Sequence, residues 1–146
     1  MDTYKKLKLL AIQWLGLAFG VAIYLFARSK TTLVFSIVDW LDLGDQIFLI
    51  RANTIPISKS LPRWFIYSLP DGLWVLSNTC INIIIWRCQI NRRNILWYLS
   101  IPTIGISSEF LQFFGFFPGI FDINDILAYC AGFVVPAFAF KLKWSE

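Results

Sequence analysis

Histidine is absent from this sequence of 146 residues, and cysteine occurs only three times. Without histidine, the chain cannot form the Ser-His or Cys-His pairs that activate many nucleophiles, or the usual zinc ligand sets. Cys80, Cys88 and Cys130 are odd in number and lack metal-ligand spacing, so a disulfide framework is not expected either. We expect no metal and no cofactor, and any chemistry would depend on carboxylates, arginines, amides and hydroxyls.

Charged residues are also scarce, at 15% of the chain, whereas 58% of the residues are hydrophobic and 18% are aromatic. That is more apolar surface than a soluble domain of this length needs for its core. A membrane is the natural solvent for such a chain, and crossing it takes a helix of about 20 mainly apolar residues. The composition therefore predicts an all-α integral membrane protein in contact with the lipid bilayer.

Four apolar segments, each bounded by charged or turn residues, are candidates for membrane-spanning helices. They cover residues 9–27, 70–86, 95–114 and 125–140 of a single integral membrane domain, 1–146. The first segment follows basic residues, as a secretory signal does. Its apolar run is too long for a typical signal, and the stretch from Tyr24 to Arg28 offers no clear small-residue cleavage site. We therefore predict a retained first helix and a four-transmembrane-helix bundle.

Lysine and arginine are distributed unevenly around the predicted spans. They gather before the first span, between the second and third, and after the fourth, at Lys5, Lys6, Lys8, Arg87, Arg92, Arg93, Lys141 and Lys143. Because cytoplasmic loops hold an excess of basic residues, this pattern predicts that both termini lie inside. The same rule explains the formal net charge of +4 better than nucleic-acid binding does, so no nucleic-acid partner is expected.

The segment 28–69 separates the first two predicted spans and is expected on the outer side. Its carboxylates Asp39, Asp42 and Asp45 argue against another span, because each would cost about 2.5 to 3.5 kcal/mol near the bilayer centre. An interfacial or re-entrant segment is the simpler interpretation. Pro56 and Pro62 predict two short elements with an irregular link between them.

Polar residues inside the third span are the clearest functional signal. Glu109 and Gln112 are three residues apart, so they project from one face of a helix. Glu109 lies about 7 Å below the outer end of the span, where no capping rule explains it. Ionisable groups inside a span usually mark a functional site, although a glutamate that is only hydrogen-bonded or protonated within the bundle is the alternative.

Three aspartates flank the predicted spans on the same side. Asp122 and Asp125 begin the fourth span after the turn GFFPGI, and one of them is expected to cap that helix. Ser68 and Asp71 have the spacing of a capping box at the start of the second span, so Asp71 has a structural and a functional interpretation.

The predicted topology brings these groups to one level of the membrane, near the cations Arg51, Lys59 and Arg63 of the outer segment. Tyr129 is four residues after Asp125, and Gly132 follows on a polar then small strip that favours close packing of another helix. Clustered carboxylates with one or two arginines are suited to binding a cation, a polar headgroup or a basic group. The candidate ligand-binding residues are Glu109, Gln112, Asp125, Asp122, Asp71, Tyr129 and Arg63.

The last third of the chain resembles the VanZ-like family of small bacterial membrane proteins, named after a protein associated with teicoplanin resistance. The matching residues are the E-x-x-Q motif from Glu109 to Gln112, a Gly/Pro turn, and Asp125, Tyr129 and Gly132. Ile120 stands where the family commonly has arginine, Tyr129 stands at its asparagine position, and SLPDGLW replaces its histidine-containing stretch. The resemblance implies a multi-pass protein of the bacterial cytoplasmic membrane and a link to antibiotic tolerance.

Three functional classes follow from these features. The leading hypothesis is an envelope-facing carboxylate pocket that recognises or handles an amphipathic or lipid-linked small molecule. The alternatives are a small proton- or cation-coupled transporter, and an accessory subunit that needs a membrane-protein partner or forms a homo-oligomer. The sequence has no nucleophile elbow or phosphate loop, so a non-enzymatic role is favoured and no catalytic residue is assigned.

Overall fold

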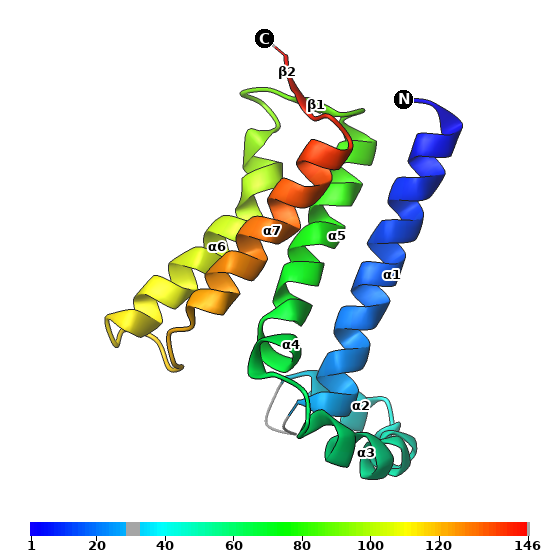
Figure 1. The fold of residues 1–146 in the computed structure, drawn as a ribbon, viewed down its shortest axis with the longest axis vertical. Coiled ribbons are helices and arrows are strands. Elements are labelled where there is room, and N and C mark those ends of the chain that lie inside the picture. Colours follow the sequence, from blue (N-terminus) through cyan, green and yellow to red (C-terminus); the bar gives the residue numbers. More distant parts are fainter. Residues whose placement is uncertain (29–32, 146) are drawn as a thin grey trace.

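The computed structural model describes residues 1–28 and 33–145 and is mostly helical. Among the described residues, the four longest helices run side by side and the three shorter ones lie at one end (Figure 1). In chain order, the elements are α1 (Thr3–Ala27), α2 (Leu33–Trp40), α3 (Gly44–Ser58), α4 (Arg63–Tyr67), α5 (Leu69–Ile85), β1 (Gln89–Ile90), α6 (Ile95–Phe113), α7 (Ile123–Ala139) and β2 (Lys143–Trp144).

The four long helices coincide with the four predicted apolar segments. Three of them begin and end within two residues of the predicted bounds. Helix α1 starts six residues earlier than predicted, because the side chain of Asp2 caps it by accepting a hydrogen bond from the Lys5 N–H at 2.7 Å. The apolar run therefore predicted only part of this helix, because a polar capping residue before that run sets where the helix starts.

Helix α1 is the one described helix that is both long and apolar enough to cross a membrane. Because it lies near the N-terminus, the same properties also fit a signal sequence. Helices α5 and α7 are apolar but contain 17 residues each. At 1.5 Å per residue they extend about 26 Å, slightly less than a typical hydrocarbon core.

Helix α5 lies at the centre of the bundle, with α1 on one side and α7 on the other (Figure 1). Small residues allow these helices to approach closely. A Cβ atom at Gly132 of α7 would collide with the carbonyl oxygen of Gly72 in α5, and one at Gly20 of α1 would lie 2.9 Å from the Trp74 indole nitrogen. The predicted packing strip around Gly132 is therefore confirmed.

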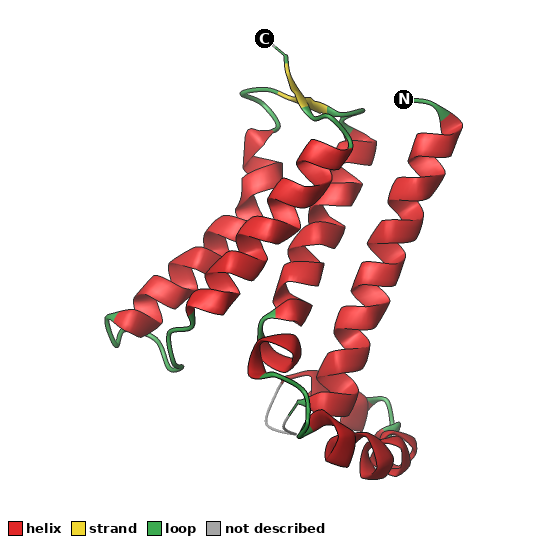
Figure 2. Ribbon diagram, in the orientation of Figure 1, coloured by secondary structure: helices red, strands yellow, loops and turns green. Residues whose placement is uncertain are grey.

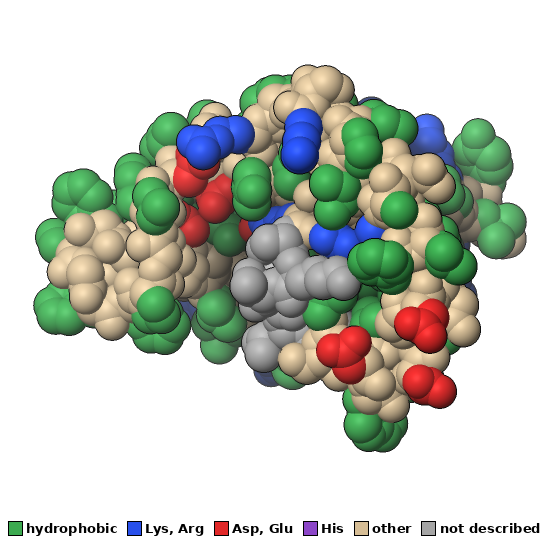
Figure 3. Space-filling model, turned by 90° about the horizontal axis from the view of Figure 1, so that it is seen from below, with side chains coloured by type: hydrophobic (Ala, Val, Ile, Leu, Met, Phe, Trp, Pro, Cys, Tyr) green, Lys and Arg blue, Asp and Glu red, His purple; other side chains and the backbone are tan. Residues whose placement is uncertain are grey.

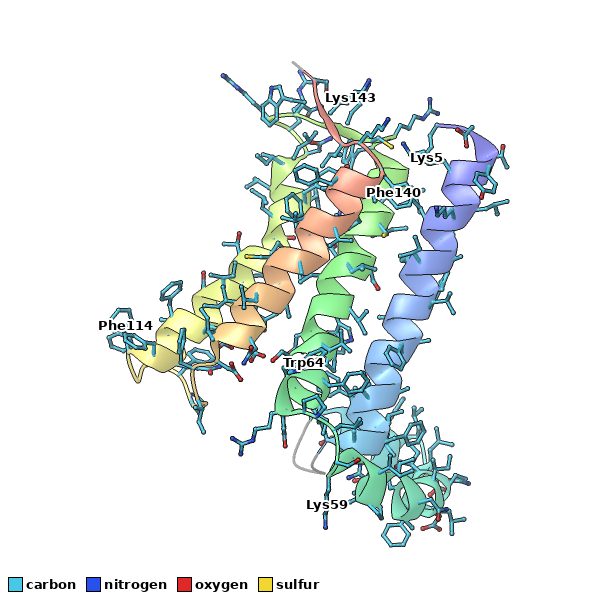
Figure 4. All side chains as sticks on the ribbon, in the orientation of Figure 1. Lys5, Lys59, Trp64, Phe114, Phe140 and Lys143 are labelled. Carbon is cyan, nitrogen blue, oxygen red and sulfur yellow. The ribbon has the colours of Figure 1, made fainter. Side chains whose placement is uncertain are left out.

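The two ends of the bundle differ in composition. The N-terminus, the C-terminus and β1 lie at one end, and α2, α3 and the turn between α6 and α7 lie at the other (Figure 1). A buried apolar cluster lies near the first end and contains Leu9, Cys80, Ile83, Tyr98 and Phe140. There the ammonium group of Lys5 donates to the Phe140 carbonyl oxygen at 2.8 Å (Figure 4).

A short parallel ladder at this end departs from the predicted all-α fold. Strand β1 pairs with β2 in the register Gln89 to Lys143 and Ile90 to Trp144 (Figure 2). Two residues per strand are too few to produce a strand signal in sequence. The pairing depends on α5 and α7 ending side by side, which brings their following residues within reach of each other.

Segment 28–69 contains α2, α3 and α4 rather than two short elements. Pro56 lies inside α3, so the predicted break there was wrong. Arg51 donates to the carbonyl oxygens of Leu25 and Arg28, and Thr54 donates to that of Phe26 at 2.8 Å. These tertiary hydrogen bonds hold α3 against the end of α1 and outweigh the one backbone hydrogen bond that Pro56 cannot make.

Candidate functional site

The end of α1 is bound to the start of α5 through Asp71. The Tyr24 hydroxyl donates to Asp71 Oδ1 at 2.7 Å, and Arg28 Nη2 lies 3.4 Å from Asp71 Oδ2. Tyr24 and Arg28 are four residues apart and so occupy one helical face, where the guanidinium lies 4.0 Å from the centre of the Tyr24 ring. Arg28 also donates to the carbonyl oxygens of Ile66 and Tyr67.

The predicted capping box at Ser68 and Asp71 is not formed. Ser68 has a helical backbone conformation, with φ −93° and ψ −39°, and its hydroxyl is buried without a hydrogen-bond partner in the described part of the chain. A capping serine needs an extended backbone to turn its oxygen toward the first helical N–H groups. Here α4 leads directly into α5, so the Asp71 carboxylate is free to bind α1 instead.

Glu109 is almost completely buried, with 3% of its surface exposed. Its Oε2 accepts a hydrogen bond from the backbone N–H of Asp122 at 3.0 Å, which joins α6 to the residue before α7. Asp122 is the N-cap of α7, and its Oδ1 accepts from the Asn124 backbone and side-chain N–H groups, both at 2.8 Å. The prediction that one aspartate of the pair is a cap is therefore confirmed.

Asp125 has no such structural explanation. Its Oδ1 atom is buried and has no hydrogen-bond partner among the described residues. A buried carboxylate oxygen normally accepts at least one hydrogen bond, because losing its hydration without compensation is costly. This oxygen is therefore a free acceptor in the place where the other polar groups gather.

These side chains border one cleft of about 440 Å³. All seven candidate residues from the sequence line it, and five more residues complete the lining: Arg28, Tyr67, Ser108, Ile120 and Phe121. The floor contains buried Glu109, whereas Arg63 and Ile120 are exposed at the rim. The tertiary structure thus brings together residues from α4 to α7 and Arg28, the residue that follows α1.

Two of the expected cations are located elsewhere. Arg51 and Lys59 do not line the cleft, although Arg63 does. Arg28, which is not among the candidate residues from the sequence, supplies the ion pair with Asp71. The sequence did contain an indication of this pair. Arg28 ends the first apolar segment on the predicted outer side, and Asp71 begins the second apolar segment on that same side.

Close packing positions Tyr129 and Gln112 in the cleft wall. A Cβ atom at Gly105 would lie 2.8 Å from the Tyr129 ring, and one at Gly119 would clash with the Gln112 amide. Gly119 also has φ +144°, a conformation that other residues rarely adopt. The α6 to α7 turn therefore holds the Gln112 side chain in place through a glycine.

The electrostatic character of the cleft follows from its lining. Four carboxylates, those of Asp71, Glu109, Asp122 and Asp125, face two guanidinium groups, those of Arg28 and Arg63. Viewed from this end, acidic side chains lie beside basic ones on one side of the molecule, and a separate acidic group lies on the other side (Figure 3). With all groups ionised, the cleft is negative and attracts positively charged groups.

Metal binding receives no support from the described residues, which contain no group of three or more acidic or cysteine side chains placed to hold an ion. Comparison with protein-family models, curated proteins and solved structures finds no match to this chain. The resemblance to the VanZ-like family therefore stays a prediction.

Proposed function

We propose that the chain is a four-span protein of the bacterial cytoplasmic membrane, with α1, α5, α6 and α7 as spans and both termini inside. Large apolar side chains on the outside of the bundle support this, for example Trp14, Ile104 and Phe138, which are 62%, 66% and 81% exposed. Soluble proteins rarely expose so many large apolar groups together. The basic flanks Lys5 and Lys143 lie at the same end (Figure 4), as the positive-inside rule requires.

Within that topology, the cleft recognises or handles an amphipathic envelope molecule, such as a lipid-linked precursor or a glycopeptide-like compound. The observation that carries this proposal is the unpartnered, buried Oδ1 of Asp125 in a cleft of about 440 Å³. A ligand N–H or O–H group would complete this acceptor. The resemblance to the VanZ-like family points to antibiotic tolerance as the cellular result.

A one-sided cleft fits recognition better than transport. Ion or proton transport would require polar groups to continue across the bundle. The buried polar side chains along α5, those of Ser77, Thr79 and Asn82, are uncharged and donate to backbone carbonyl oxygens. Near the other end, the described residues pack into an apolar cluster that includes Leu9, Ile83 and Phe140. We therefore favour binding at the outer face over a proton- or cation-coupled transporter.

The test is growth of a bacterial host that produces the protein, measured across a dilution series of glycopeptide and lipoglycopeptide antibiotics. Glu109→Gln and Asp125→Asn remove charge from the cleft with little change in shape. Asp42→Asn is the matched control, because Asp42 is exposed, lies at the same end and does not line the cleft. Membrane levels of each variant are measured by immunoblotting.

We expect both cleft variants to lose tolerance while the control keeps it, at equal protein levels. Unchanged tolerance in the cleft variants would contradict the proposal. Co-purification of a stoichiometric membrane partner that is lost only with Glu109→Gln would instead assign the cleft to assembly. Proton flux in liposomes that depends on Glu109 would assign it to transport.

A further inference from the structure

A second pocket adjoins the cleft and has the opposite charge. It encloses about 320 Å³, and its charged lining residues are Arg28, Arg51, Lys59 and Arg63. No carboxylate is among its lining residues in the part of the chain that the structure describes. We call it the cationic pocket.

Arg51 is buried in this pocket with 3% of its surface exposed. Its guanidinium donates to two carbonyl oxygens at the end of α1 and lies over the Phe35 ring, 4.7 Å from the ring centre. Its Nε atom is buried and has no hydrogen-bond partner among the residues that the structure describes. Asp39 and Asp45 border a separate hollow that Arg51 also lines, but neither forms an ion pair with it.

Capping of α1 explains part of the role of Arg51, because carbonyl groups at a helix end attract a cation. It does not explain Lys59 and Arg63, which line the same pocket and form no ion pair among the described residues. A buried cation without an anion is unfavourable, and several cations around one hollow increase the repulsion. The pocket therefore has the composition of an anion site.

Phosphate is an anion that such a lining suits. Guanidinium groups present several donors in a fixed plane that match phosphate oxygens, and a lysine adds a mobile point charge. The pocket lies at the end of the bundle where a lipid headgroup would be found, because Lys59 is at the end opposite Lys5 and Lys143 (Figure 4). Basic pockets between membrane helices bind lipid headgroups at the cytoplasmic face, and the same charge-assisted hydrogen bonds to phosphate can form at the outer face.

An apolar pocket of about 210 Å³ adjoins the cationic pocket on another side. The two pockets share Ala27, Ser58 and Leu61. Aromatic and aliphatic side chains from α1, α3 and α4 form most of its lining, among them Phe19, Phe26, Ile57 and Phe65. In turn, the cationic pocket shares Arg28, Arg63 and Tyr67 with the carboxylate-lined cleft.

The three sites therefore follow one another in the order apolar, cationic, anionic. This order matches one class of amphipathic molecule, a zwitterionic phospholipid, in which an acyl chain is followed by a phosphate diester and then by a primary ammonium group. We propose that such a phospholipid binds across all three sites. Its phosphate lies beside Arg51, Lys59 and Arg63, its ammonium group reaches Asp125, and an acyl chain enters the apolar pocket.

This inference rests on the proposed function, because it names the chemical class that the cleft recognises. The test is native mass spectrometry of delipidated protein in detergent, titrated with phosphatidylethanolamine, phosphatidylglycerol or free phosphoethanolamine. Phosphatidylglycerol keeps the phosphate and the chains but lacks the ammonium group. We expect it to bind about tenfold more weakly than phosphatidylethanolamine, because its headgroup hydroxyls can donate to Asp125 but bring no positive charge to the negative cleft.

Lys59→Gln combined with Arg63→Gln tests the cationic pocket. Both side chains are exposed, so their replacement does not open the core, as replacement of Arg51 would. The control is Arg92→Gln combined with Arg93→Gln, which removes the same charge beside β1 at the opposite end (Figure 1). We expect the first pair to weaken phosphatidylethanolamine binding at least tenfold and the control pair to leave it unchanged.

Three results would overturn the inference. They are equal binding of the two phospholipids, equal losses in the two double variants, and binding of free phosphoethanolamine as tight as that of the lipid. If the antibiotic phenotype still depends on Glu109 and Asp125 in any of these cases, the proposed function stands with a different ligand. If that dependence is absent as well, both proposals fail.

Discussion

The carboxylate of Glu109 accepts a hydrogen bond from the backbone N–H of Asp122, with 3.0 Å between oxygen and nitrogen. This contact joins α6 to the beginning of α7 and gives a buried glutamate a structural role. The same carboxylate borders the cleft. Its structural and binding roles are separable, because glutamine can accept the same hydrogen bond without carrying the charge.

Glu109→Ala should lower the free energy of unfolding by about 1 to 3 kcal/mol, because it leaves the Asp122 N–H without its acceptor. Glu109→Gln should retain most of that stability while losing the antibiotic phenotype. Denaturant unfolding of the protein in detergent measures both values. Asp39→Ala, at an exposed position, is the control and should change the stability by less than about 0.5 kcal/mol. Equal losses for the alanine and glutamine variants would contradict the hydrogen-bond argument.

Tyr24→Phe should destabilise the protein by about 1.5 to 3 kcal/mol, because it removes a hydrogen bond to the Asp71 carboxylate. The stacking of this ring on Trp74, with centres 5.2 Å apart, is preserved in phenylalanine. Tyr4→Phe removes a hydroxyl from a side chain that is 78% exposed and should have no measurable effect. Thermal unfolding of the three proteins compares the two positions, and equal midpoints would show that the Tyr24 hydroxyl does not stabilise the fold.

Gly132→Ala should cost about 1 to 3 kcal/mol, because the added methyl group would collide with the Gly72 carbonyl oxygen and push α7 from α5. Gly44→Ala is the matched control. Its Cβ would lie 3.5 Å from an Asp39 carboxylate oxygen, an ordinary contact, at the start of α3. Unfolding in detergent measures both changes, and a neutral Gly132→Ala would mean that α5 and α7 tolerate a wider separation.

The proposed topology predicts which single cysteines react with a membrane-impermeant maleimide in intact cells. In a background with Cys80, Cys88 and Cys130 replaced, cysteine at position 45 or 118 should be labelled from outside. Cysteine at position 93 should be labelled only after the membrane is permeabilised. All three positions are exposed on the protein surface, so accessibility reports membrane side rather than burial. Labelling of position 93 in intact cells would contradict four spans with both termini inside.

Secondary structure was largely predictable from the sequence, because long apolar runs bounded by charged or turn residues have a simple local cause. The failures occurred where local signals competed with tertiary contacts. Pro56 was expected to divide the segment 28–69 together with Pro62, but hydrogen bonds from Arg51 and Thr54 to the end of α1 hold α3 in place around Pro56. The β1 and β2 ladder was missed because two residues per strand carry no periodicity.

The sequence also showed which residues form the candidate site, because an ionisable group in an apolar run is conspicuous. It did not show the role of each residue. Ser68 and Asp71 have the spacing of a capping box, yet the continuous backbone from α4 to α5 leaves Asp71 to bind Tyr24 and Arg28. Between Asp122 and Asp125, the sequence could not decide which aspartate is the cap.

By itself, the sequence determined the apolar character of the chain, the positions of the four long helices and the set of polar residues near one end. These properties depend on composition and on order along the chain. Only the tertiary structure decided that Arg28 pairs with Asp71, that Asp125 keeps an unpartnered oxygen, and that cationic and apolar pockets adjoin the carboxylate cleft. Those relationships depend on how α1, α4, α6 and α7 pack around α5 and how α3 packs on α1. Helix packing is set by side chains far apart in sequence.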